Sequence, residues 1–223
     1  MDASESMQSH ISGNRAIAVQ YAQRFLRQQT DQAFVGDFVR RARILQPWTA
    51  DPTALTAAIR KVSAGAGSLS QGTAIFDTVY RACEFQFGAI DNAASGNFIL
   101  LFSDGEDNTS AMRLQDAVDA CQRANTTIYA FRAEPEPGFS SPGPATLAEL
   151  TAQTGGRVFR DNDSEAAIYD DLRIIEADLR NQYRLVYKPA DLKHDGTFHR
   201  IALIPPERVD SITIRSGYYA PAH

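Results

Sequence analysis

The chain has 223 residues, of which 43% are hydrophobic and 22% charged, so its composition is that of an ordinary globule large enough for one α/β domain with an extension. A net charge of -5, with scattered Lys and Arg, excludes the electrostatic footprint of a nucleic-acid or anionic membrane binder. No apolar run approaches the roughly 20 residues that cross a bilayer, so we expect no membrane span in this chain.

The first third of the chain predicts a helix, a hairpin and a second helix. Apolar residues recur at helical spacing over residues 13–27. Residues 33–39 and 41–48 have the composition of strands and are separated by a tight connection, which indicates an antiparallel hairpin. Asp51 followed by Pro52 is a helix start signal, and we expect this helix to run to about residue 63.

The middle of the chain predicts alternating strands and helices. A Gly- and Ser-rich loop, residues 64–72, leads into a helix over residues 74–87. Residues 97–103 are almost continuously apolar, which is typical of a strand buried on both faces of a parallel sheet. Helices at 112–123, 146–154 and 164–181 then alternate with strands at 127–132 and 157–160. This order predicts a doubly wound, Rossmann-like, mostly parallel α/β domain over residues 1–181.

After residue 181 the pattern changes to strands alone. We expect strands over residues 183–188, 199–204 and 211–215, separated by Pro and Gly turns. Residues 182–223 are therefore predicted to form a C-terminal antiparallel β appendage that packs on the domain or extends it.

The two cysteines, Cys83 and Cys121, fall on the apolar faces of separate predicted helices. Buried free thiols are the favoured interpretation, because a buried thiol behaves as a small hydrophobe. The alternative is a disulfide between the two helices. Neither cysteine has the neighbours of a zinc site.

Five oxygen-bearing residues are predicted to gather at one edge of the sheet, where open α/β sheets bind ligands. Asp104 ends the apolar strand, Asp2, Ser4 and Ser6 alternate just before the first helix, and Thr73 follows the Gly-rich loop. Carboxylate and hydroxyl oxygens, with no imidazole or thiolate beside them, suit a hard cation such as Mg²⁺, or Mn²⁺ or Ca²⁺.

These residues, in this order, resemble the metal-ion-dependent adhesion site of von Willebrand factor type A domains, over about residues 2–180. The resemblance implies that both serines and the threonine contact the metal, and that the two aspartates bind it directly or through water. It also implies that a protein partner completes the metal shell with an acidic side chain. The tail, which ends in Gly-Tyr-Tyr-Ala at residues 217–220, is similar to the C-terminal end of the acidobacterial-type VWFA-related proteins.

The resemblance also points to a missing element. The family places a buried apolar strand directly before the first aspartate, whereas here only Met1 precedes Asp2. Losing about five buried apolar residues at ~1.5–3 kcal/mol each rivals the ~5–15 kcal/mol that stabilises a whole domain. We therefore expect a form with a truncated N-terminus, in which an added upstream strand raises the melting temperature. This chain does not indicate its location, but the resemblance implies a secreted or extracytoplasmic full-length protein.

Each site residue also has an interpretation without a ligand. Ser4, Ser6 or Thr73 could cap a helix, and Asp104-Gly105 is a turn signal. The neighbouring acidic residues are predicted to form a solvated rim, and the histidines to have surface or structural roles. The acidic residues are Glu5, Glu106 and Asp107, and the histidines are His10, His194, His199 and His223.

The function favoured by the sequence is a non-enzymatic, divalent-metal-dependent module for protein–protein interaction or adhesion. A Mg-dependent enzyme of phosphatase or nucleotide-binding type is the first alternative. It is disfavoured because the Gly65-x-Gly67 segment lacks the GK[ST] of a P-loop, Asp2-Ala3-Ser4 lacks a second aspartate, and no GxSxG elbow is present. The second alternative is a metal-independent scaffold with a decayed site, whose tail strands bind partners by β-augmentation.

Overall fold

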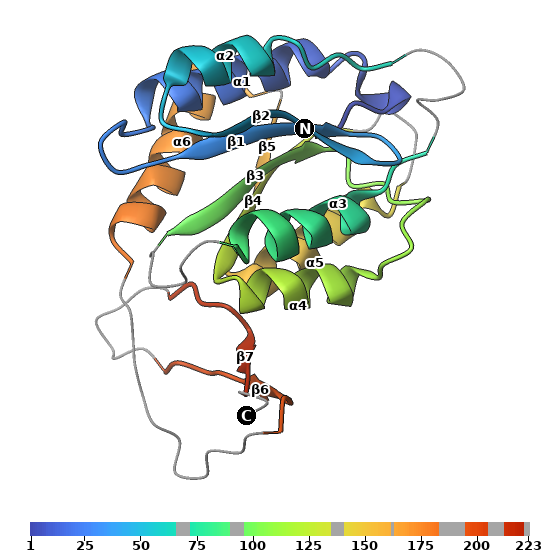
Figure 1. The fold of residues 1–223 in the computed structure, drawn as a ribbon, viewed down its shortest axis with the longest axis vertical. Coiled ribbons are helices and arrows are strands. Elements are labelled where there is room, and N and C mark those ends of the chain that lie inside the picture. The colour runs from blue at the N-terminus through green and yellow to red at the C-terminus, as the bar shows by residue number, and fades with distance from the viewer. Residues whose placement is uncertain are drawn as a thin grey trace.

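A computed structural model describes residues 1–65, 72–89, 96–134, 141–161, 163–182, 195–204 and 212–220. It shows a sheet between two layers of helices, with α1 and α2 on one face and α3, α4 and α5 on the other (Figure 1). The doubly wound α/β class predicted from the sequence is confirmed. In the ranges above, no helix is long and apolar enough to cross a membrane.

The helices keep the predicted order with shifted ends. They are η1 (Glu5–Met7), α1 (Ile11–Arg24), α2 (Pro52–Ile59), α3 (Ile75–Arg81), the π-helical η2 (Ala82–Phe87), α4 (Leu114–Arg123), α5 (Gly143–Thr154) and α6 (Glu165–Arg180). The predicted start at Asp51 is confirmed, because its side chain accepts a hydrogen bond from Thr53 N at 2.8 Å. The single helix expected over residues 74–87 is instead α3 continued by η2.

The strands of the described residues form three hydrogen-bonded groups. β1 (Ala33–Phe38) and β2 (Ala42–Thr49) make the predicted antiparallel hairpin. β3 (Asn97–Ser103), β4 (Thr126–Arg132) and β5 (Val158–Arg160) form a parallel sheet. β6 (Phe198–Arg200) and β7 (Gly217–Tyr219) form a small antiparallel pair.

Residues Met1 to Ala3 link the hairpin to the parallel sheet. Asp2 N donates to Phe102 O of β3 at 2.9 Å, while Ala3 N donates to Phe38 O of β1 at 2.8 Å. Phe38 N in turn donates to Met1 O at 3.0 Å, and Asp2 and Phe38 form a parallel bridge. The N-terminus therefore lies between β1 and β3 (Figure 1), and the strand order is β2-β1, residues 1–3, then β3-β4-β5.

Among the described residues, two large apolar clusters cover the two faces of the sheet, and a third, smaller cluster contains Ala3, Ile11 and Val62. Neighbouring residues of β3 point to opposite clusters: Phe102 packs with α1, α2 and α6, and Leu101 with α3, α4 and α5. Phe131 of β4 is fully buried and stacks between Phe102 and Phe159, at centroid distances of 5.3 and 5.4 Å. Helices thus lie on both faces of the apolar run at residues 97–103, as its composition predicts, and its last three residues are buried.

The prediction of free thiols is wrong. Cys83 of η2 and Cys121 of α4 form a disulfide, and both residues are fully buried. The helices that carry them pack closely enough to place the two Cα atoms 4.8 Å apart, within the range that a disulfide spans. Helical periodicity put both cysteines on apolar faces, but it carries no information on whether those faces meet.

The tail is only partly as predicted. β6 starts at Phe198 and ends at Arg200, so residues 201–204 are not a strand, and the last strand lies at residues 217–219 rather than 211–215. The strand predicted over residues 183–188 lies outside the described residues. Gly217 allows β7 to lie this close to β6, because a Cβ at this position would lie 2.3 Å from His199 O.

The tail docks on the domain through a few polar contacts. Gln122 Nε2 of α4 donates to Ser216 Oγ at 3.0 Å, and Ser216 N donates to Gln153 O of α5 at 3.3 Å. The Arg215 guanidinium donates to Asn125 Oδ1 at 2.8 Å, next to the start of β4. The appendage therefore contacts the domain at the amino end of the parallel strands.

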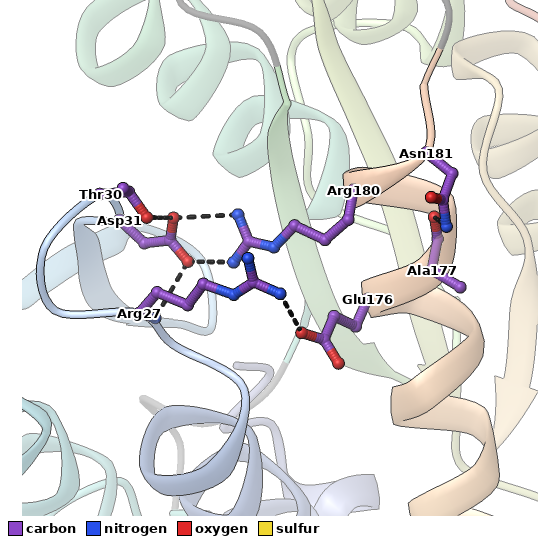
Figure 2. A network of polar contacts seen from close by, with 7 residues as sticks. All are labelled: Arg27, Thr30, Asp31, Glu176, Ala177, Arg180 and Asn181. Carbon is purple, nitrogen blue, oxygen red and sulfur yellow. Dashed lines mark hydrogen bonds and ion pairs between the residues drawn. The ribbon is translucent and has the colours of Figure 1, made fainter.

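An ionic network ties the end of α6 to the loop that enters β1 (Figure 2). The Asp31 carboxylate accepts hydrogen bonds from Arg180, from Arg27 N at 3.1 Å and from Thr30 Oγ1 at 2.8 Å, while Arg27 also pairs with Glu176 at 3.1 Å. Burial alone would raise the pKa of Asp31, but these hydrogen bonds and the Arg180 charge outweigh it and hold the pKa below its usual value.

The network should stabilise the fold only while Asp31 is ionised. Because the pKa of Asp31 is lower in the folded chain, its contribution is fully present above the unfolded value of about 3.9 and is lost as the pH falls through the folded pKa. We expect Arg180→Met to cost at most about 1 kcal/mol near neutral pH. Melts of both proteins between pH 6 and 3 should show the difference shrinking, and a constant difference would contradict this assignment.

Candidate functional site

Asp2 occupies a fixed, buried position at the carboxyl end of β3. Its carboxylate accepts a hydrogen bond from Ser4 N at 2.9 Å through Oδ1 and from Ser103 Oγ at 2.6 Å through Oδ2. The whole residue is 0% exposed, so its side chain is fully buried. Asp2 is therefore held by both its backbone and its side chain, even though it lies next to the first residue of the chain.

Ser4 and Ser6 lie together at the start of η1. Their Oγ atoms are 3.1 Å apart, with Ser4 buried and Ser6 exposed. Neither η1 nor α1 has a side-chain hydrogen bond from its N-cap residue, Ser4 and His10 respectively. The capping interpretation of Ser4 is therefore wrong, and its hydroxyl is directed at Ser6 instead.

Asp104 follows β3 at the same edge of the sheet. Its Oδ1 accepts a hydrogen bond from Glu106 N at 3.0 Å, an interaction that an aspartate commonly makes with the backbone two residues on. Gly105 has a φ of +87°, and a Cβ there would lie 2.2 Å from Gly143 O at the start of α5. Only glycine allows this close approach, which fixes the path of the loop that carries Asp104.

The Asp2 carboxylate is affected by its burial and by the charge of Asp104. Burial raises the pKa of Asp2 to about 6; hydrogen bonds from Ser103 and Ser4 act against this, and the negative charge of Asp104 adds to it. A buried carboxylate beside a second one is the electrostatic situation that a bound cation relieves. Carboxylates and hydroxyls are also the oxygen donors that a hard divalent cation prefers, so the residues fit such an ion.

No group of three or more His, Cys, Asp or Glu side chains able to hold a metal is found within the described ranges. A cation at this edge would therefore depend on hydroxyl oxygens and water in addition to Asp2 and Asp104. Mg²⁺ keeps several waters in its shell and is bound in proteins by one or two carboxylates, which matches this donor set.

Thr73 is buried and pinned to the loop that follows Asp104. Its N–H donates to Asn108 Oδ1 at 2.8 Å, and its carbonyl accepts from the N–H groups of Asn108 and Thr109 at 3.0 and 3.1 Å. Gly72, with a φ of +83°, leaves room for Thr109, whose Cγ2 would lie 2.5 Å from a Cβ there. The rest of the predicted Gly-rich loop, residues 66–71, lies outside the described residues.

Thr73 does not cap α3, because other side chains do. Asp107 Oδ2 accepts from Phe76 N at 2.9 Å, and Ser110 Oγ accepts from Asp77 N at 3.1 Å. The prediction that Asp107 belongs to a solvated acidic rim is therefore wrong, whereas Glu5 and Glu106 are exposed as expected.

Three further residues order this site and were not predicted to do so: Ser103, Asp107 and Asn108. Ser103 orients the carboxylate of Asp2, and the other two fix the segment that carries Thr73. Asp and Asn just after a turn glycine commonly accept hydrogen bonds from nearby backbone amides, so a signal was present for the last two. For Ser103 the only signal was its place at the strand end, before Asp104.

The described histidines have structural contacts. His10 Nδ1 lies 2.9 Å from Asp161 Oδ2; burial raises the pKa of Asp161, and the nearby His10 opposes this shift. His199 stacks on Tyr218 at a centroid distance of 5.3 Å. His194 and His223 lie outside the described residues.

The fold and the candidate site together define a doubly wound α/β domain with carboxylates and hydroxyls at the carboxyl ends of its parallel strands. The family model of the von Willebrand factor type A domain matches residues 1–172. The chain therefore belongs to this family, whose domains bind proteins and are usually non-catalytic interaction modules. No curated protein matches the sequence.

Solved structures with the same fold include bacterial and animal proteins. The conserved hypothetical protein BatB from Bacteroides thetaiotaomicron is 15% identical, with a TM-score of 0.63 over 81% of this chain and 96% of its own. A von Willebrand factor type A protein from Catenulispora acidiphila is 20% identical, with a TM-score of 0.58 over 79% and 40%. Proximal thread matrix protein 1 from the mussel byssus, solved with a zinc-occupied MIDAS motif, is 16% identical, with a TM-score of 0.62 over 81% and 46%.

Proposed function

We propose that this domain is a non-enzymatic module that binds a divalent cation through Asp2, Ser4, Ser6, Thr73 and Asp104 and uses it to bind a protein partner. The partner would offer an acidic side chain as a further oxygen ligand. The observation that carries the proposal is the buried Asp2 carboxylate, oriented by Ser103 and Ser4 with Asp104 beside it.

The occupied MIDAS motif of the mussel protein supports a divalent cation at this place in the fold. That protein holds zinc, whereas the donors of this chain are all oxygens, so we propose Mg²⁺ as the cation, with Mn²⁺ or Ca²⁺ as substitutes. We assign two roles to the described polar side chains of the candidate site: some are metal ligands, and the others orient those ligands. His10, which could act as a base, is engaged by Asp161.

We also propose that the protein belongs to the acidobacterial-type VWFA-related subgroup and works outside the cytoplasm. The buried Cys83–Cys121 disulfide supports this location, because structural disulfides persist in oxidising compartments.

The test is a thermal melt in EDTA and again in millimolar Mg²⁺ or Mn²⁺. A cation at 100 times its dissociation constant should add about 2.7 kcal/mol to the free energy of unfolding. We expect Asp104→Ala to lose this response while the EDTA melt stays close to that of the native chain. Glu106→Ala, which removes an exposed carboxylate two residues away, is the matched control and should keep the response.

Two results would count against the proposal. A response retained in Asp104→Ala would place the cation elsewhere, and no response in the native chain would favour a scaffold with a decayed site. Metal-dependent turnover of a phosphate ester that vanishes in Asp2→Ala would instead revive the enzyme alternative.

A further inference from the structure

The turn between β1 and β2 lies beside the candidate metal site. Phe38 O, at the end of β1, accepts a hydrogen bond from Ala3 N at 2.8 Å. Val39 O, in the turn, accepts one from Ala74 N at 2.8 Å. Ala3 lies in sequence between two of the proposed ligands, and Ala74 directly follows a third. The turn therefore adjoins two of the three segments that carry the site, at the side of the sheet where α3 begins (Figure 1).

Exposed cationic residues surround this turn. Val39 packs in the small apolar cluster that contains Ala3 and Val62, so the end of α2 and the turn lie together. Two residues of the turn follow Val39 directly, and two residues at the end of α2 precede Val62. All four are exposed, and they are Arg40, Arg41, Arg60 and Lys61. The candidate site thus has a basic flank, although the whole chain has a net charge of -5.

The arginines of the turn differ from the other arginines at the carboxyl ends of the strands in having no carboxylate partner. Arg43 of β2 pairs with the buried Asp37 at 2.8 and 2.5 Å. Arg132 and Arg160 both lie near Glu134, at 2.5 and 3.5 Å. Within the described ranges, neither residue of the turn, 40 or 41, has an ion pair with Asp or Glu. These two guanidinium groups are therefore available to an anion from outside the chain.

The turn lies within the span of a short peptide segment bound at the metal. Residues 1–3 and β1 are hydrogen-bonded neighbours, which places their backbones ~4.8 Å apart. In an extended peptide, side chains two positions apart point to the same face and are separated by ~6–7 Å. When one carboxylate of such a segment is bound at the metal, the side chain two positions away is within reach of Arg40 and Arg41.

We propose that Arg40 and Arg41 bind a second carboxylate of the partner, so that the partner segment carries two acidic residues two positions apart. This inference rests on the proposed function, in which the first carboxylate completes the metal shell. A polypeptide is the expected source of both carboxylates, because domains of this family bind proteins. The exposed Glu5 and Glu106, each next to a proposed ligand or two residues from one, repel a second carboxylate and so favour the side of the turn.

The test compares two capped peptides in millimolar Mg²⁺ at low ionic strength. Acetyl-Gly-Asp-Gly-Asp-Gly-amide offers two carboxylates, and acetyl-Gly-Asp-Gly-Asn-Gly-amide offers one in nearly the same shape. Either aspartate of the first peptide can reach the metal, which alone makes its binding about twofold tighter. With the ion pairs to the turn added, we expect a preference of at least fivefold for the two-acid peptide, measured by calorimetry. High salt should reduce this preference, because exposed charges are screened.

Three double variants assign the preference to the turn. Arg40→Gln with Arg41→Gln should lower it to about twofold, while the Mg²⁺-dependent rise in melting temperature stays. Arg40→Lys with Arg41→Lys keeps both charges and should retain most of the preference, which guards against a folding defect in the first variant. Arg81→Gln with Arg173→Gln removes two exposed arginines from α3 and α6, away from the site, and should change nothing.

The outcomes separate this inference from the proposed function. If the native chain responds to Mg²⁺ in the melt but shows no preference, or if the preference survives Arg40→Gln with Arg41→Gln, the inference is wrong and the metal site stands. No Mg²⁺ response in the melt would defeat the proposed function itself, and this inference with it. Tighter binding of a short single-stranded DNA, lost in the same Gln variant, would assign the arginines to phosphate groups and overturn the inference as well.

Discussion

Replacing both Cys83 and Cys121 by alanine is expected to lower the free energy of unfolding by about 4 kcal/mol. The disulfide joins residues that are 38 positions apart. In the chain-entropy description, cross-linking a loop of this length removes that much conformational freedom from the unfolded chain. Since a domain of this size is stable by only about 5–15 kcal/mol, the loss is a large part of the total.

The measurement is urea unfolding at equilibrium, followed by circular dichroism, on the native chain and the double variant. A control separates the cross-link from packing: the native chain with its disulfide reduced in denaturant and kept reduced retains both sulfur atoms, so it reports the cross-link alone. If the reduced chain and the double variant both stayed within about 1 kcal/mol of the oxidised chain, the bond would contribute little and the entropic estimate would be refuted.

Local sequence patterns predicted most of the elements, because those patterns have local physical causes. The apolar run that became β3 and the Asp51-Pro52 start of α2 depend on side chains within one element. The hairpin of β1 and β2 needed only a short connection between two strand-like segments. All three were predicted correctly in kind and to within a few residues in extent.

Contacts between distant elements could not be predicted in the same way. Whether Cys83 meets Cys121 depends on how η2 packs on α4, and the pairing of β7 with β6 joins residues about 19 positions apart, such as His199 and Tyr218. The sequence does not reveal how Asp2 is anchored: its own N–H donates to Phe102 O, and its neighbours Met1 and Ala3 form backbone hydrogen bonds with Phe38.

In the candidate site, too, the features that depend on local sequence were predicted, and those that depend on contacts between distant segments were not. Asp2, Ser4 and Ser6 are close in sequence and are brought together by hydrogen bonds, and Asp104 directly follows β3, as its place after the apolar run predicts. The residues that orient these side chains were not predicted, because they act through contacts between segments that are far apart in the sequence. Ser103 reaches Asp2 over a sequence separation of 101, which no local pattern encodes.

Ser103→Ala is therefore the variant that should affect the site most without removing any proposed ligand. Ser103 Oγ donates to Asp2 Oδ2 at 2.6 Å and accepts from Gly105 N at 3.1 Å, and the residue is 0% exposed. The variant leaves a buried carboxylate oxygen and a buried amide without this partner, which should cost about 1–3 kcal/mol of stability in EDTA. Groups that orient a metal ligand in this way typically account for 10–100-fold in metal affinity.

The control variant for Ser103→Ala must lower the stability of the chain through a substitution outside the candidate site. Ser164→Ala removes the N-cap of α6, where the hydroxyl accepts from Ala167 N, and should cost about 0.5–2 kcal/mol. Titration of both variants with Mn²⁺, followed by calorimetry, should show 10–100-fold weaker binding in Ser103→Ala and unchanged binding in Ser164→Ala. Equal metal affinity in the two variants would mean that Ser103 only stabilises the fold and that the cation does not depend on the orientation of Asp2.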